Sequence, residues 1–214
     1  MNYKIHGASM KIMMFENGPF MVNTYLVVDE ASNEGFILDP GSGLHALMTQ
    51  VQKDAITIRA IVCTHAHIDH IAGAKMVQDS FSAPLYLNRL EEGLLQSIQT
   101  QARMFGVPDP GIPRVDHYLP DAGLLEIASM RFTLLHTPGH SPGSMSLYAE
   151  EVVFSGDALF NMSIGRTDLP GGDYQLLISA IQDKLFTLPD DTTVLCGHGP
   201  ETRIGFEKRM NPFF

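Results

Sequence analysis

The chain has 214 residues, of which 44% are hydrophobic and 18% charged, and its formal net charge is −10. This length and composition predict one globular domain over residues 1–214 with a sizeable core. The acidity and the lack of any basic run argue against a nucleic-acid partner, and no apolar run approaches the ~20 residues of a membrane span.

The two cysteines and the N-terminus bear on the cellular compartment. Cys63 and Cys196 are too few for a disulfide framework, and both lie in apolar, strand-like runs. We therefore expect buried, reduced thiols. The N-terminal residues lack the charged and then apolar segments of a signal peptide. These features predict a soluble cytoplasmic protein without a membrane partner; they leave the oligomeric state open.

The first half of the chain alternates strand-like and helical patterns. Asn17-Gly18-Pro19 marks the first turn, and Ser42 is positioned to cap a helix whose residues Leu44, Leu47 and Val51 share one face. We expect strands at 10–16, 20–28, 34–38, 56–63 and 84–87, and helices at 43–53, 69–81 and 89–105.

The second half repeats this rhythm after a loop rich in proline and glycine at 106–114. We expect strands at 115–119, 124–128, 131–136, 144–149, 151–155 and 192–196, a loop at 160–173 and a helix at 174–186. Two halves that each carry strands, a polar turn and a helix predict two sheets packed face to face with helices outside.

Metal-ligand residues gather where the expected strands end. Residues 65–70 hold three histidines and one aspartate directly after the buried strand at 56–63. Imidazole and carboxylate are ligands for divalent metal ions. Later strand ends carry three more such residues, each directly next to a glycine: His140, Asp157 and His198.

If these strand ends converge, they bring seven ligands together, too many for one tetrahedral ion. They suit two ions that share a carboxylate. His65 and His67 alternate and can face one ion, whereas Asp69 and His70 follow the turn and can face a second. The remaining histidines are assigned no role in the site: His6, His45, His117 and His136.

The stretch Thr64-His65-Ala66-His67-Ile68-Asp69-His70 resembles the signature of the metallo-β-lactamase superfamily. The resemblance covers nearly the whole chain and implies an α/β fold, a four-layer αβ/βα sandwich with the site at one edge. It implies a first metal ion on His65, His67 and His140 and a second on Asp69, His70 and His198, with Asp157 bridging them. It further implies that Asp69 acts in catalysis by orienting the nucleophile, and that Asp39 steadies the histidine-rich loop from behind the ligands.

Asp157 stands where the best-known zinc β-lactamases carry a cysteine, and residues 103–106, 165–170 and 210–213 resemble short bacterial glyoxalase II-like proteins (hydroxyacylglutathione hydrolases). This resemblance implies hydrolysis of a small-molecule thioester by a metal-bound hydroxide. It implies two divalent metal ions, with zinc as the first choice and iron or manganese as alternatives. Few residues follow His198, so we do not expect the C-terminal helical domain that holds glutathione in long glyoxalase II, and the thiol stays open. Arg166 is a candidate to bind a substrate carboxylate, with a loop-fixing ion pair as the equal alternative.

Two other functions are considered. Gly165-Arg166-Thr167-Asp168 also resembles the persulfide dioxygenases, which use one iron ion; their site would be His65, His140 and Asp157. A non-catalytic, metal-stabilised binding protein is the third hypothesis, and the complete ligand set argues against it.

Overall fold

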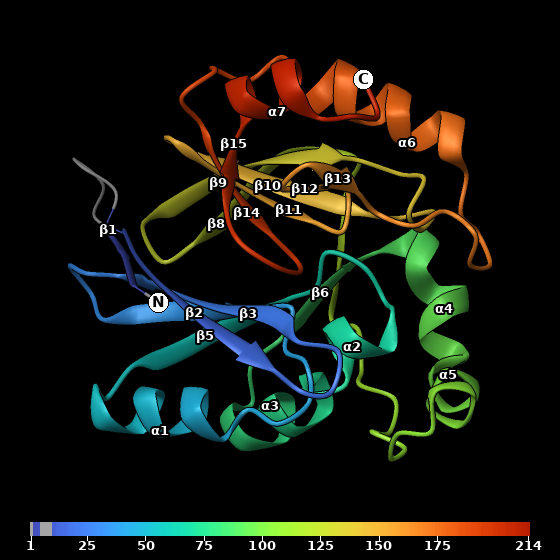
Figure 1. Ribbon diagram of the computed structural model, residues 1–214. Coiled ribbons are helices and arrows are strands. Elements are labelled where there is room, and N and C mark those ends of the chain that lie inside the picture. Colours follow the sequence, from blue (N-terminus) through green and yellow to red (C-terminus); the bar gives the residue numbers. More distant parts are fainter. Residues whose placement is uncertain (1, 5–9) are drawn as a thin grey trace.

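Two sheets pack face to face, and helices cover the outer face of each sheet (Figure 1). The computed structural model describes residues 2–4 and 10–214. Among these residues, the first sheet has the strand order β1-β2-β3-β4-β5-β6-β7 and the second the order β15-β14-β11-β10-β9-β8. The predicted α/β sandwich of four layers is confirmed.

The first sheet and its helices come from residues up to 119. Its strands are β1 (Asn2–Lys4), β2 (Met10–Asn17), β3 (Val22–Asp29), β4 (Glu34–Leu38), β5 (Thr57–Val62), β6 (Leu85–Asn88) and β7 (His117–Leu119). The helices are α1 (His45–Lys53), α2 (Ile68–Ile71), α3 (Ala74–Phe81), a 3₁₀ turn (Arg89–Glu91), α4 (Glu92–Gln96) and α5 (Ile98–Phe105).

The second sheet follows. Its strands are β8 (Ala122–Ile127), β9 (Met130–His136), β10 (Met145–Ala149), β11 (Val152–Gly156), β14 (Thr193–Cys196) and β15 (Thr202–Arg203). A small hairpin, β12 (Leu159–Phe160) and β13 (Ser163–Ile164), lies outside it. Helix α6 (Tyr174–Ala180) continues as a π-helical turn (Ile181–Leu185), and α7 (Ile204–Met210) follows β15.

Three buried hydrophobic clusters hold the four layers together. One lies between the sheets, where Phe36 of β4 meets Phe132 of β9 edge to face with ring centroids 5.2 Å apart. A second joins the first sheet to its helices, and a third joins the second sheet to α6 and α7. Strands buried on both faces explain the continuous apolar runs in the sequence.

The strand pairing brings the polar strand ends to one edge. β4 and β5 are parallel, with Leu38 opposite Val62, and β11 and β14 are parallel, with Gly156 opposite Cys196. Backbone hydrogen bonds then join the two sheets at this edge: Asn23 N donates to Gly197 O at 2.7 Å, and Met145 N donates to Thr64 O at 2.9 Å. The residues that follow β4, β5, β11 and β14 therefore meet.

The predicted helix over 69–81 is wrong in its continuity, because the chain bends between α2 and α3. Gly73 lies at the bend and donates its N–H to Pro40 O at 2.7 Å. A Cβ at Gly73 would lie 2.3 Å from Gly41 O, so only glycine permits this approach. The bend fixes α2, which carries two ligand candidates, against the Pro40–Gly41 turn.

Three other local predictions need correction. Ser42 does not cap α1, which begins at His45 with Leu44 as its N-cap and no side-chain capping bond. The helix expected over 89–105 is divided into a 3₁₀ turn, α4 and α5, with Ser97 between the last two. The loop expected at 160–173 includes part of the β12–β13 hairpin.

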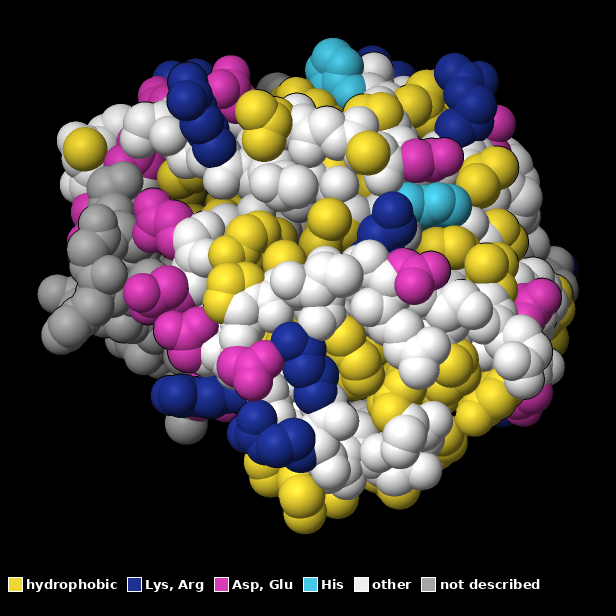
Figure 2. All heavy atoms as spheres, turned by 90° about the horizontal axis from the view of Figure 1, so that it is seen from above, with side chains coloured by type: hydrophobic (Ala, Val, Ile, Leu, Met, Phe, Trp, Pro, Cys, Tyr) yellow, Lys and Arg dark blue, Asp and Glu magenta, His cyan; other side chains and the backbone are white. Residues whose placement is uncertain are grey.

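Figure 2 shows the face above α6 and α7, where basic and acidic side chains alternate with hydrophobic ones and no broad basic patch is seen. Exposed apolar residues on these two helices include Leu176, Phe206 and Met210. Within the described residues, no helix is long and apolar enough to cross a membrane.

Candidate metal centre

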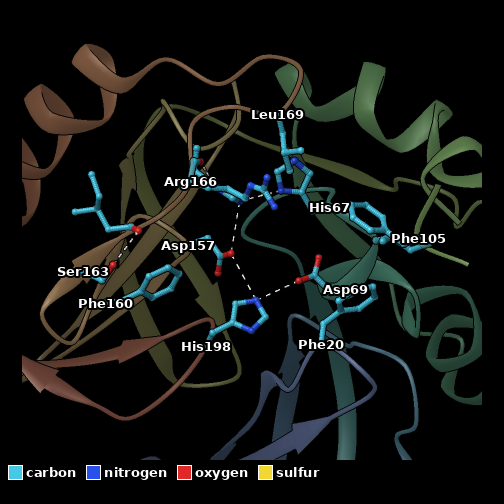
Figure 3. Close-up of a pocket in the computed structure, with 13 residues that line it drawn as sticks. Phe20, His67, Asp69, Phe105, Asp157, Phe160, Ser163, Arg166, Leu169 and His198 are labelled. Carbon is cyan, nitrogen blue, oxygen red and sulfur yellow. Dashed lines mark hydrogen bonds and ion pairs between the residues drawn. The ribbon is translucent and has the colours of Figure 1, made fainter. Parts of the chain in front are cut away.

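The seven predicted ligands meet at the edge where the strands end. They lie in or beside a cavity of about 430 Å³, on whose walls Asp69, Asp157 and His198 face one another (Figure 3). His65 and His67 precede α2, Asp69 and His70 lie within it, and the others follow β9, β11 and β14. The condition set from the sequence, that these strand ends converge, is therefore met, while the ligand roles stay a prediction.

The first group consists of three imidazoles. His140 Nε2 lies 2.8 Å from His67 Nδ1 and 3.2 Å from His65 Nε2. All three side chains are buried, His65 completely. Potential ligand atoms of His65, His67 and His140 all lie within 4.8 Å of one another, so they can face one ion.

The second group combines two imidazoles and a carboxylate. His198 Nε2 lies 3.1 Å from Asp69 Oδ2 and 3.3 Å from His70 Nε2. Asp69, His70 and His198 again offer ligand atoms within 4.8 Å of one another. This group is less deeply buried than the first, because Asp69 and His198 line the open cavity.

Asp157 lies between the two groups. Its Oδ1 is 3.2 Å from His70 Nε2, and its Oδ2 is 3.5 Å from His140 Nε2 and 3.6 Å from His198 Nε2. The carboxylate thus contacts one member of the first group and two of the second. This position is the one that a bridging ligand requires.

The hydrogen bonds of the rings show where their lone pairs point. His140 Nδ1 lies 2.8 Å from Arg166 O, and His70 Nδ1 lies 3.0 Å from Asp39 Oδ2. A carbonyl and a carboxylate can only accept, so both Nδ1 atoms carry hydrogen and donate. In the neutral rings the Nε2 atoms are then bare acceptors, directed toward the neighbouring ligands.

A hydrogen-bond relay gives His65 the same tautomer. Thr64 Oγ1 lies 2.7 Å from Asp39 Oδ2 and donates its one hydrogen to that carboxylate. His65 Nδ1, 3.0 Å from the same hydroxyl, must therefore donate to it. Asp39 also accepts from Thr64 N at 2.7 Å. Asp39 thereby orients His70 directly and His65 through Thr64, as expected for a residue behind the ligands.

The protonation states favour a bound cation. Burial, together with the neighbouring imidazoles, lowers the pKa of His65 well below its usual value and that of His67 to about 4. Burial would also lower the pKa of His70 and His198, but the nearby carboxylates of Asp157 and Asp69 outweigh it and raise both. The imidazoles of His65 and His67 are thus deprotonated, as metal ligation needs, whereas a cation that binds the second group would displace the protons that the carboxylates favour on His70 and His198.

Buried polar atoms without hydrogen-bond partners also bear on whether metal ions fit this site. Asp157 Oδ1, which lies between the ligand groups, is buried and has no partner in hydrogen-bond geometry; His67 Nε2 also lacks one, but it is not the ring nitrogen that faces His140. Such atoms are costly unless something else satisfies them. Gly197 leaves this space open, since a Cβ there would lie 2.1 Å from Asp157 Oδ1. Bare Nε2 atoms, ionised carboxylates and an unsatisfied bridging oxygen fit two divalent cations.

Two residues that support the centre were missed from the sequence. Glu91 is fully buried and accepts from Ala66 N at 2.8 Å and from Gly143 N at 2.6 Å, joining the loops of His65 and His140. Gln101 accepts from Ile68 N at 2.9 Å and donates to Ala66 O. Both lie in a helical stretch whose spacing gives no sign of a polar task.

Glu91→Gln is expected to destabilise the protein by about 1–3 kcal/mol, because glutamine has one acceptor oxygen and leaves one buried N–H facing an amide NH₂. Burial raises the pKa of Glu91. A raised pKa in the folded state means that wild-type stability falls as pH rises from about 4 through the folded value. The difference in free energy of unfolding between wild type and Glu91→Gln should therefore become smaller over that pH range. Urea unfolding at several pH values measures this, with Glu92→Gln as the neighbouring control; an unchanged midpoint would contradict it.

The guanidinium of Arg166 pairs with Asp168, Nε to Oδ1 and a terminal nitrogen to Oδ2, both at 2.7 Å. This is the loop-fixing ion pair that the sequence left open, although Arg166 also lines the cavity. Its substrate role stays a prediction. Cys63 and Cys196 are free and buried, as expected, and burial raises the pKa of Cys196 to about 12.

The other histidines that the structure describes belong to neither ligand group. His117 packs against Tyr86 with ring centroids 4.6 Å apart, and His136 Nε2 bonds to Pro142 O at 2.9 Å. His45 is exposed at the start of α1. His6 lies outside the described residues.

Known proteins share this sequence and fold. The metallo-beta-lactamase superfamily pattern matches residues 17–198. The chain is 37% identical over 203 residues to the hydroxyacylglutathione hydrolase GloC of Haemophilus influenzae. This match covers 91% of this chain and 93% of that protein. The crystal structure of the BLEG-1 B3 metallo-beta-lactamase is 43% identical with a TM-score of 0.88, over 94% of this chain and 98% of that one. The crystal structure of TTHA1623 in a di-iron-bound form is 35% identical in sequence and has a TM-score of 0.85; the match covers 94% of this chain and 100% of that one. The chain thus belongs to the metallo-beta-lactamase superfamily.

Proposed function

We propose that this protein hydrolyses a small-molecule thioester at two divalent metal ions, as a glyoxalase II-like enzyme. The observation that carries the proposal is the place of Asp157 between the two ligand groups, with contacts to His70, His140 and His198. The relative named for hydroxyacylglutathione hydrolysis supports this choice of reaction.

Bound there, two such ions would lower the pKa of a shared water toward neutrality and polarise a carbonyl oxygen. His65, His67 and His140 would hold one ion, and Asp69, His70 and His198 the other, with Asp157 shared. Zinc is our first choice for this ligand set, and the di-iron form of a relative makes iron the alternative to test.

Asp69 has the second task of orienting the attacking water. Burial works against its ionisation, but the charge of His70 and the hydrogen bond from His198 outweigh burial and lower the pKa of Asp69. Its carboxylate therefore stays an acceptor at neutral pH, at the cavity wall (Figure 3). Phe20 and Phe105 meet edge to face with ring centroids 5.5 Å apart and form an apolar part of the same cavity wall.

Metal quantification combined with a substrate panel tests the proposal. We expect two ions per chain, and hydrolysis of S-lactoylglutathione or of its shorter-thiol analogues. A β-lactam belongs in the panel because a 43% identical structure is that of a B3 metallo-beta-lactamase. Hydrolysis of the β-lactam alone would show that the substrate is a lactam and not a thioester. If the metal-loaded protein hydrolysed no member of the panel, the non-catalytic binding protein would be favoured.

The persulfide dioxygenase remains the second candidate, because its smaller ligand set is also assembled. His140 Nε2 lies 3.2 Å from His65 Nε2 and 3.5 Å from Asp157 Oδ2. One iron per chain with oxygen uptake on glutathione persulfide would establish this function and reject the thioesterase.

Arg166→Gln tests the predicted contact with a substrate carboxylate. If Arg166 binds it, KM for S-lactoylglutathione should rise about 10-fold, the loss expected for one exposed charged contact. KM for a thioester without a carboxylate should not change. Asp168→Asn is the matched control, since it frees the guanidinium from its partner. Equal KM changes for both substrates would show that the ion pair only fixes the loop.

A further inference from the structure

A second cavity of about 410 Å³ adjoins the metal-site cavity, between α4–α5 on one side and residues 142 and 169–170 on the other. His67, Phe105 and Leu169 line both cavities. Figure 3 shows these three residues grouped on the side of the site away from Phe160 and Ser163. A group bound in the second cavity would therefore lie beside the imidazoles of the first ligand group.

The walls of this second cavity are apolar. Apart from His67, no described residue that lines it has an ionisable side chain. Leu90, Leu94 and Met104 supply aliphatic and thioether groups, and Pro142 and Pro170 close the opposite wall without an N–H. Leu90 and Met104 are 55% and 66% exposed, so this apolar surface reaches the solvent at the mouth.

The polar side chains in the wall are already engaged with the protein. Ser97 Oγ donates to Leu94 O at 2.8 Å. Gln101 Nε2 donates to Leu94 O at 3.0 Å and to Ala66 O at 3.3 Å, and its Oε1 accepts from Ile68 N. Ser97 and Gln101 thus have no hydrogen left to donate. Thr100 Oγ1 accepts from the Arg103 guanidinium at 2.9 Å and keeps its one hydrogen, so besides His67 the wall offers a polar ligand a single exposed hydroxyl.

We propose that this cavity binds an uncharged hydrocarbon arm of the thioester substrate, a choice of substrate that rests on the proposed function. Its volume falls in the range of small-molecule sites. At the roughly 30 Å³ that a water molecule occupies in the liquid, a cavity of about 410 Å³ has room for about fourteen groups of that size, more than the eight carbon atoms of an octanoyl chain require. The arm is either the acyl chain or the thiol chain; both present the same chemistry to the cavity.

Two series of thioester substrates, assayed with the metal-loaded protein, show whether the acyl chain or the thiol chain occupies the cavity. The first extends the acyl chain from acetyl to octanoyl on N-acetylcysteamine, and the second extends the alkyl thiol of acetyl thioesters. In the series that uses the cavity, kcat/KM should rise about fourfold for each methylene buried, the factor expected from hydrophobic transfer. The other series should stay flat.

Gly93→Leu blocks the cavity. Gly93 lies in α4 and in the cavity wall, and no heavy atom lies within 4 Å of a Cβ built there, so the new side chain enters open space. Gln96→Leu is the matched control, because it adds the same side chain to an exposed position of the same helix outside the cavity. Gly93→Leu should reduce the gain per methylene to less than about twofold, and Gln96→Leu should keep it.

Binding of 1-octanol provides a readout that does not need catalysis. The ¹³C-methyl signal of Met104, assigned with Met104→Leu, should shift with octanol in wild type and Gln96→Leu but not in Gly93→Leu. Flat rates in both substrate series, or an equal gain in Gly93→Leu and wild type, would overturn the proposal. If no thioester is hydrolysed at all, the proposed function fails, and the Met104 signal alone then decides whether the cavity takes a hydrocarbon.

Discussion

Asp157→Ala should remove one of the two metal ions and lower kcat by more than about 100-fold, the upper end of what losing a residue behind the ligands costs. The carboxylate lies within 3.6 Å of three imidazoles from both ligand groups. Without it, His70 keeps only Asp69 and His198 as neighbours for the second ion, whereas the three imidazoles of the first group remain complete. One ion per chain is the expected content.

Metal content by plasma emission spectrometry and thioester hydrolysis measured on the same sample test this expectation. Asp168→Ala is the control, since Asp168 is an exposed carboxylate next to the cavity-lining Leu169. The hydrogen bond from Arg166, first of all, lowers the pKa of Asp168 to about 2. Two ions and retained activity in Asp157→Ala would show that Asp157 does not bridge. An unfolded variant would be recognised by circular dichroism, and Asp157→Asn, which keeps the shape, would then replace it.

The sequence identified the residues that meet at the candidate site because metal-ligand residues leave a strong local pattern. Four ligand-type residues within 65–70 have few structural explanations, and glycine beside His140 or His198 marks turns at strand ends. Parallel pairing then brings such ends to one edge of a sheet. Most strands were predicted within a few residues for a similar reason, since short apolar runs bounded by turn residues leave few alternatives.

What the sequence did not reveal depends on contacts between distant residues. The bend at Gly73 arises because the backbone of Gly41 lies 2.3 Å from where a Cβ would stand, and helical spacing does not report such an approach. Glu91 joins the loops of Ala66 and Gly143, which lie 25 and 52 residues from it in the chain. Gln101 acts on residues more than 30 positions away. Neither has a neighbour in sequence that would mark it as polar support for the site.

The apolar cavity beside the site was also not predicted. Its walls come from α4, α5 and the loop near residue 170, and each of these segments reads as an ordinary amphipathic or proline-rich stretch. Only the packing of α4–α5 against the edge of the sandwich places them together, at the right of Figure 1. Ligand residues can be found from local patterns, whereas the shape of a substrate site requires the tertiary structure.

Asp39→Asn should weaken the binding of both metal ions by about 10- to 100-fold, although Asp39 belongs to neither ligand group. The buried carboxylate accepts three hydrogen bonds, from Thr64 N, Thr64 Oγ1 and His70 Nδ1. Asparagine tolerates the positive φ of 49° at this position, so the backbone should be kept. Its one carbonyl oxygen cannot replace both carboxylate oxygens, and one buried donor is left facing an NH₂ group, at about 1–3 kcal/mol of stability.

Thr64→Val separates the two branches of this network. Valine removes the hydroxyl through which Asp39 orients His65, but the backbone N–H of residue 64 and the direct bond from His70 to Asp39 can remain. The variant should therefore weaken the first ion, held by His65, His67 and His140, about 10-fold and leave the second nearly unchanged. Titration calorimetry of the metal-free proteins with zinc, which resolves two binding steps, measures both affinities. Equal losses at both steps in Thr64→Val would mean that Asp39 acts on the loop as a whole and not through separate imidazoles.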